Sequence, residues 1–130
     1  MTDEKILHEI VQLARKVHLE LGPGYVESVY VRALISELKS NGFRIEREKL
    51  IKIWYGSQLV GRHRLDLLVN SEIIIELKAN RGILPLHLAQ IRSYLHATEY
   101  PLGLILNFGA TALEWEVVPA ISDEPSGMST

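Results

Sequence analysis

The stretch that decides the expected fold is Arg64-Leu65-Asp66-Leu67-Leu68-Val69, a turn at Asn70-Ser71, and then Glu72-Ile73-Ile74-Ile75-Glu76-Leu77-Lys78. Both apolar segments are typical of β-strands, and the short turn between them predicts that they are neighbours. Side chains two residues apart point to the same face of a strand, so Glu76 and Lys78 share a side. Burying a carboxylate costs several kcal/mol unless it is paired or bound to a metal. The charges on these strands therefore mark a candidate site.

The segment before this pair predicts a long hairpin. Apolar residues alternate with polar ones on both sides of a turn at 55–57, and they are Phe43, Ile45, Ile51, Ile53, Leu59, His63, Leu65, Leu67 and Val69. By this alternation Asp66 shares a face with Arg62, Arg64 and Leu68, opposite Leu65 and Leu67. His63 falls on the Leu65 side and is expected in a core or at an interface. The run Ile73-Ile74-Ile75 predicts a central strand covered on both faces.

Three helices are predicted around these strands. Apolar residues recur at helical spacing from Leu7 to Leu21 after a cap at Asp3, and a second helix is expected from about Val26 to Lys39. Its first turn holds Glu27, where the helix dipole favours an acid. A third helix starts at Pro85 and ends near Ala97, with His87, Gln90 and Tyr94 along one side. Strands at 102–106 and 115–118 complete a mixed α/β arrangement of a sheet with flanking helices.

Composition restricts the class of protein. The chain has 130 residues, of which 47% are hydrophobic, so a single domain is expected over residues 1–121, followed by a disordered tail at 122–130. No apolar run is long enough for a membrane span and the N-terminus does not resemble a signal peptide, so a cytoplasmic protein is expected. The absence of cysteine excludes disulfides and thiolate zinc sites.

Charge is distributed unevenly along the chain. The formal net charge of −2 argues against a nucleic-acid partner, because phosphate binding usually draws on basic residues. However, residues 39–92 contain ten basic residues against five acidic ones, while both ends are acidic. A basic middle segment keeps nucleic acid among the expected partners.

Three motifs occur in order along the chain, and together they carry a resemblance. They are Gly24-Tyr25-Val26-Glu27-Ser28-Val29-Tyr30, then Asp66 with Glu76-Leu77-Lys78, then Gln90 to Tyr94 with Asn107-Phe108-Gly109. Over about residues 5–118 the sequence resembles the GxxExxY protein family, a branch of the PD-(D/E)XK nuclease-like superfamily. The resemblance implies a restriction-endonuclease-like core, with a mixed central β-sheet flanked by α-helices. One departure is Leu65, which stands where the superfamily name has proline.

The resemblance also implies roles for particular residues. Asp66 and Glu76 look like ligands of Mg²⁺ or Mn²⁺, with the Leu77 carbonyl as a third ligand and Glu27 joining the metal shell. Lys78 looks like the residue that orients or deprotonates the attacking water and offsets charge on the phosphorane. With Tyr94, Gln90 resembles a QxxxY element that contacts metal water or the DNA backbone. Carboxylate oxygens independently suit a hard cation that keeps several waters.

Three hypotheses follow from these residues. The first is a Mg²⁺-dependent phosphodiesterase acting on DNA or RNA, and a homodimer would extend the small surface that one domain offers to nucleic acid. The second is a catalytically inactive nuclease-fold module that binds nucleic acid or a protein partner. The third is a structural ion cluster, in which Arg64 or Lys78 neutralises the acids. His87 could reach a phosphate, although a helical histidine is usually a surface or boundary residue.

Overall fold

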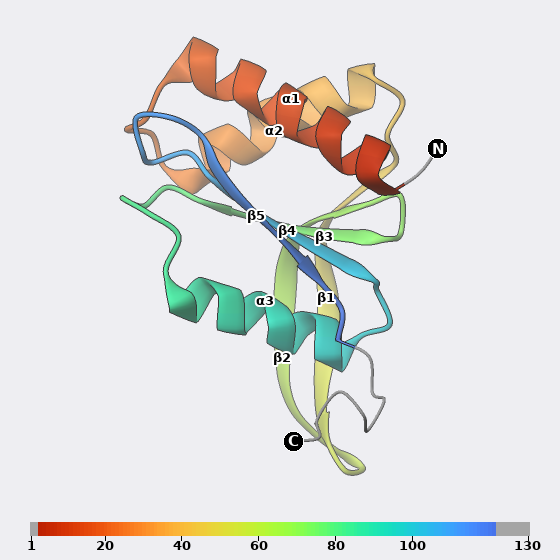
Figure 1. Cartoon of the computed structure of the whole chain (residues 1–130). Coiled ribbons are helices and arrows are strands. Elements are labelled where there is room, and N and C mark those ends of the chain that lie inside the picture. The colour runs from red at the N-terminus through yellow and green to blue at the C-terminus, as the bar shows by residue number, and fades with distance from the viewer. Residues whose placement is uncertain (1–2, 122–130) are drawn as a thin grey trace.

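The computed structural model describes residues 3–121 as a five-stranded sheet with helices on both faces (Figure 1). The elements in chain order are α1 (Asp3–Leu21), α2 (Glu27–Ser40), β1 (Ile45–Tyr55), β2 (Gln58–Val69), β3 (Ile73–Lys78), α3 (Pro85–Ala97), β4 (Leu102–Asn107) and β5 (Glu114–Pro119). These bounds confirm the predicted helices and strands to within a few residues. The tail predicted at 122–130 lies outside the described residues.

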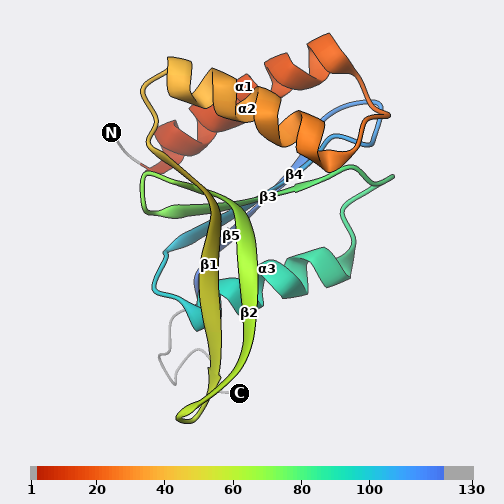
Figure 2. The ribbon, with the colours of Figure 1, turned by 180° about the vertical axis from the view of Figure 1, so that it is seen from behind.

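The order of strands in the sheet follows the chain, β1-β2-β3-β4-β5. The β3–β4 pair is parallel and the other three pairs are antiparallel, so the sheet is mixed as predicted. Parallel neighbours need a crossover connection, and α3 supplies it. Helices α1 and α2 cover one face of the sheet and α3 covers the other, as the two opposite views show (Figures 1 and 2). No helix within residues 3–121 has the length and apolar character needed to cross a membrane.

Each face of the sheet has its own hydrophobic core. The core under α1 and α2 includes Ile10, Leu34, Leu67, Ile75, Leu77 and Leu106. The core under α3 includes Leu65, Leu68, Ile74, Ile91, Leu95 and Ile105. Residues Ile73, Ile74 and Ile75 are fully buried, which confirms that their strand is central and covered on both faces.

The hairpin of β1 and β2 departs from the simple alternation predicted for it. Leu65 and Leu67 are two residues apart, yet Leu67 packs under α1 and α2 whereas Leu65 packs under α3. The change occurs where Glu48 has a left-handed backbone, with φ of 55°, and where strand pairing skips Glu48 and Asp66. Beyond this point residues 49–64 project past the rest of the sheet as a two-stranded arm (Figure 2). The prediction that Leu65 lies opposite Leu68 is therefore wrong.

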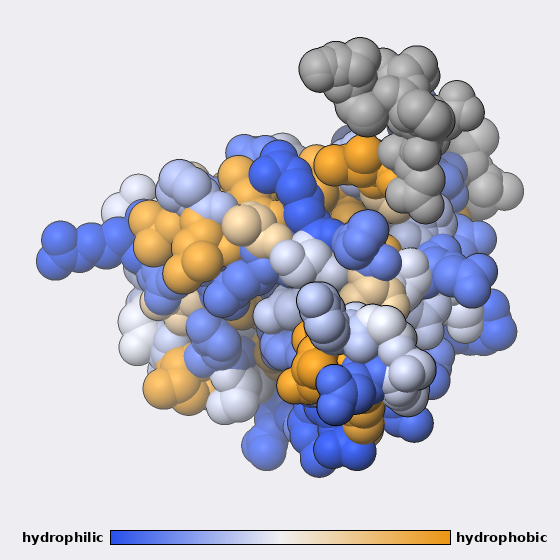
Figure 3. Space-filling view, turned by 90° about the horizontal axis from the view of Figure 1, so that it is seen from below, coloured by the Kyte–Doolittle hydropathy of each residue, from blue (hydrophilic) through white to orange (hydrophobic). Residues whose placement is uncertain are grey.

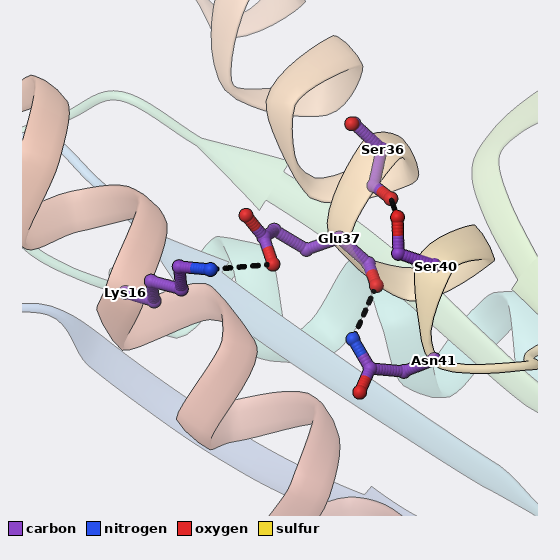
Figure 4. A network of polar contacts seen from close by, with 5 residues as sticks. All are labelled: Lys16, Ser36, Glu37, Ser40 and Asn41. Carbon is purple, nitrogen blue, oxygen red and sulfur yellow. Dashed lines mark hydrogen bonds and ion pairs between the residues drawn. The ribbon is translucent and has the colours of Figure 1, made fainter.

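Helices α1 and α2 are joined at the surface by one ion pair. Lys16 Nζ lies 3.2 Å from Glu37 Oε1, and the C-terminal turn of α2 is closed by Ser40 and Asn41, which donate to the carbonyls of Ser36 and Glu37 (Figure 4). An exposed pair of this kind contributes at most about 1 kcal/mol. The two helices are therefore held mainly by the apolar core beneath them.

The loop before α2 is fixed by Tyr30. This side chain is fully buried and stacks on Phe108 with ring centroids 4.7 Å apart. Its hydroxyl donates to the Gly22 carbonyl at 2.6 Å and accepts from the Tyr25 N–H at 3.2 Å. Packing in the core was the role predicted for Tyr30, and its hydroxyl holds the chain that leads to Glu27.

The loop after β3 is locked to the end of β4. Asn107 is fully buried; its Oδ1 accepts the Asn80 N–H at 2.9 Å and its Nδ2 donates to the Asn80 carbonyl at 3.0 Å. The Phe108 N–H donates to the Lys78 carbonyl at 2.8 Å. A Cβ added to Gly109 would lie only 2.2 Å from the Asn80 carbonyl oxygen. The close approach of this glycine therefore fixes the backbone that follows Lys78.

Replacing Gly109 with alanine should lower the free energy of unfolding by about 1–3 kcal/mol, because the new methyl group would displace the backbone at Asn80. Thermal and urea denaturation would measure the change. Gly82→Ala, in the loop between β3 and α3, is the matched control, since a Cβ there would meet only Glu114 Oε1 at 3.8 Å. Equal stability of the two variants would show that the Gly109 loop can relax without cost.

Candidate active site

Asp66 and Glu76 meet where β2 and β3 separate. Regular pairing of these strands reaches only Leu67–Ile75. Beyond it, Glu76 Oε2 accepts the Asp66 N–H at 3.0 Å, and Asp66 Oδ2 accepts the Leu77 N–H at 2.8 Å. Each carboxylate thus uses one oxygen to bind the backbone of the opposite strand. The other oxygen of each acid accepts no hydrogen bond, and Glu76 Oε1 faces His63 Nε2 at 3.6 Å.

The negative charge of this pair is poorly compensated. Glu76 is buried, and burial, followed by the nearby Asp66 charge, raises its pKa to about 8. Burial also raises the pKa of Asp66, whereas the Lys78 ammonium acts in the opposite direction on both acids. Within residues 3–121, neither acid has a lysine or arginine nitrogen within 4.0 Å. The structure therefore does not form the ion cluster with Arg64 or Lys78 that was one of the three hypotheses.

Lys78 is the last residue of β3 and is half-buried. It stands two positions after Glu76, so both side chains lie on the α3 face of the sheet, opposite Leu77. In the described part of the chain the Lys78 ammonium forms no hydrogen bond or ion pair. An unpaired ammonium beside two acids is available to act on a bound molecule.

His63 also belongs to this site, which sequence analysis missed. Its ring stacks on Tyr94 of α3, with centroids 4.0 Å apart and planes at 13°. Its Nε2 atom lies 3.6 Å from Glu76 Oε1 and has no hydrogen-bond partner. Burial lowers the pKa of His63 and, followed by the charges of Glu76 and Asp66, raises the pKa of Tyr94. Only the left-handed backbone at Glu48 brings His63 to this side, and a glutamate gives no signal of such a conformation.

Two other expected residues lie at the margin of the site. Glu27, the first residue of α2, is exposed and lines a cleft of about 200 Å³ together with Asp66 and Glu48. Gln90 is half-buried on α3, and within residues 3–121 its side chain forms no hydrogen bond. The structure thus places Glu27 beside the carboxylates, whereas nothing in it ties Gln90 to them.

His87 has a structural role at the start of α3. It is buried, its Nδ1 accepts the Leu84 N–H at 3.0 Å, and its Nε2 lies 3.2 Å from Asn80 Nδ2. Burial lowers the pKa of this imidazole. Both ring nitrogens are therefore engaged in holding the helix start and the preceding loop.

The carboxylate oxygens of this site limit which metal ion it could hold. In the described chain no group of three or more His, Asp and Glu side chains is arranged to hold one, so Glu27 is not drawn in with Asp66 and Glu76. Two carboxyl groups, each with one oxygen that accepts no hydrogen bond, fit a hard cation that keeps most of its waters. They do not fit a closed four-ligand zinc site.

Comparison with known proteins agrees with the fold of the chain. Residues 4–118 match the family model described as the PD-(D/E)XK nuclease superfamily. A solved structure titled "Crystal structure of SSO0001" has a similar fold, with 23% sequence identity and a TM-score of 0.58 over 76% of this chain and 52% of that one. The chain thus spans about half the length of that structure. A comparison with the curated proteins gave no match.

Proposed function

The chain belongs to the PD-(D/E)XK nuclease superfamily, and from this premise we propose that it is a metal-dependent nuclease hydrolysing phosphodiester bonds in DNA or RNA. The observation that carries the proposal is the buried Glu76 beside the half-buried Asp66, both with raised pKa values and with no lysine or arginine paired to them, next to Lys78. Two acids in such a place are unfavourable for folding. A bound cation and a phosphate would compensate their charge. The order of its motifs further supports membership of the GxxExxY branch.

In the proposed site Asp66 and Glu76 would hold Mg²⁺ or Mn²⁺, with the Leu77 carbonyl and Glu27 as further ligands. The cation supplies positive charge that stabilises the phosphate and makes water easier to deprotonate. Lys78 orients or deprotonates the attacking water, and its ammonium offsets charge that develops on the phosphate. Gln90 contacts the substrate backbone from α3.

A second candidate is a nuclease-fold module without catalysis that binds nucleic acid or a protein partner. It is favoured by one observation, namely that in the described residues only two carboxylates converge where a metal set would have three or more members. This alternative predicts no cleavage with any divalent cation. It also predicts salt-dependent binding if nucleic acid is the partner.

Cation binding separates the two candidates before any substrate is known. Mg²⁺ and Mn²⁺ should bind the wild type with about millimolar affinity or better, and binding should vanish in an Asp66→Asn/Glu76→Gln double variant. Titration calorimetry measures both affinities. Asp3→Asn/Glu4→Gln removes the same two kinds of charge from the first turn of α1, outside the site, and should bind as the wild type does.

A screen of labelled DNA and RNA, with each cation and with chelator, then tests turnover. Cation-dependent cleavage that the double variant lacks would support the nuclease. Cleavage retained in that variant would exclude the proposed site.

A further inference from the structure

Three cations share the outer face of the hairpin arm at residues 49–64. Lys52 and Arg62 are directly opposite in the register of β1 and β2, and Arg64, two residues from Arg62, faces Leu50. All three cations are exposed. The other face of the arm carries Ile51, which packs under α3.

These cations are not neutralised by the protein. Among residues 3–121 none of the three has a carboxylate within 4.0 Å. The acids at the base of β1 are already paired elsewhere, since Glu46 lies 3.4 Å from Lys49 and Glu48 lies 3.9 Å from Arg47. Like charges directly opposite each other destabilise an antiparallel pair. The Lys52–Arg62 pair therefore costs stability that nothing within the described chain offsets.

The row of cations leads to the candidate active site. Arg62 and Arg64 share one face of β2, about 6.5–7 Å apart, and Asp66 follows two residues later, where the pairing with β1 is interrupted. Arg64 thus lies two residues from Asp66, which lines the cleft beside Glu27. A polyanion bound along the arm would contact the arginines and extend to the site of Asp66 and Glu76.

We propose that the outer face of the arm binds the phosphate backbone of a nucleic acid and guides it to the site of Asp66 and Glu76. The inference rests on the proposed function in taking a nucleic acid as the partner. The outer face of the arm is the surface that would hold the nucleic-acid strand. Charge complementarity favours this occupant, because a second copy docking by the same face would bring like charges together. The surface seen from the arm's end also shows separate orange patches with blue side chains between them, not one apolar face (Figure 3).

Binding without cleavage tests this surface. In chelator, the anisotropy of a labelled single-stranded DNA of mixed sequence, and of its duplex, would be measured against wild type and Lys52→Gln/Arg62→Gln/Arg64→Gln. Affinity should fall by about tenfold or more, and the slope of log K against log salt should lose about 2–3 units. Arg32→Gln/Lys39→Gln/Arg44→Gln is the matched control, because it removes three exposed cations outside the arm. It should lose much less affinity.

The melting temperature distinguishes recognition from folding. The arm variant should melt at or above the wild-type temperature, because repulsion between Lys52 and Arg62 is relieved. A lower melting temperature would show that the cations serve the fold, and unchanged affinity, or no binding by the wild type, would equally overturn the inference. A wild type that binds through the arm but never cleaves would refute only the proposed nuclease activity. Cleavage that the arm variant retains at full rate and affinity would refute only the role of the arm.

Discussion

Lys78→Ala should lower the rate of phosphodiester cleavage by about 10³-fold, the size expected when a group acting on the nucleophile or the developing charge is lost. The residue stands two positions from Glu76 on the same face of β3, and its ammonium has no partner within the described chain. Initial rates on the substrate that the wild type cleaves, with Mg²⁺ or Mn²⁺, would measure the effect. Cation affinity should remain nearly unchanged, because Lys78 is not a ligand.

The stability of the Lys78→Ala protein is the control, because it shows whether Lys78 supports the fold. At pH 6, where Glu76 is largely protonated, Lys78→Ala should change the free energy of unfolding by less than about 1 kcal/mol. If Lys78 instead neutralised the acids, removing one partner of a buried pair would cost about 3–5 kcal/mol. Lys39→Ala on the outside of α2 should keep full activity. Retained cleavage by a folded Lys78→Ala protein would remove the proposed mechanism.

Much of the fold was predictable because its signals are local. An isoleucine run bounded by a turn predicted β3, and Pro85 with the apolar spacing after it predicted α3 with its observed bounds. Because a strand fixes which residues share a side, the position of Glu76 beside Lys78 also followed from the sequence. The family match over residues 4–118 supports the same core.

The rest depends on contacts or conformations without a local signal. The alternation of β2 holds only while the strand is regular, and the left-handed residue Glu48 on its neighbour ends that regularity. An L-residue with a side chain adopts this conformation at a cost, so no propensity scale would place it at a glutamate. His63 therefore lies on the α3 side with Leu65 and not with Leu67, and its Nε2 atom is 3.6 Å from Glu76 Oε1. The contact of Gly109 with Asn80 likewise joins residues 29 positions apart.

In metal-free protein, stability should fall as the pH rises from 6.5 to 8, and Glu76→Gln should remove most of that fall. Burial, then the Asp66 charge, raises the pKa of Glu76 from 4.5 to about 8. In this window the unfolded chain has already released the proton that the folded chain still holds, so ionisation favours unfolding increasingly as the pH rises. The variant should be about 1–3 kcal/mol more stable than the wild type at pH 8. Denaturation in chelator across the window measures the difference.

The window begins at 6.5 because His63, whose pKa burial lowers, contributes the opposite slope below that pH. The groups that act on Glu76 are His63, Asp66, Lys78 and Glu27, and all are present in both proteins. Glu72→Gln, at the turn before β3, should keep the wild-type slope. A Glu76→Gln protein less stable than the wild type at pH 8 would mean that the ionised carboxylate supports the fold. Greater stability together with lost Mg²⁺ binding would mean that the acid is retained for the cation at a cost to folding, since a ligand that binds only the native state stabilises it.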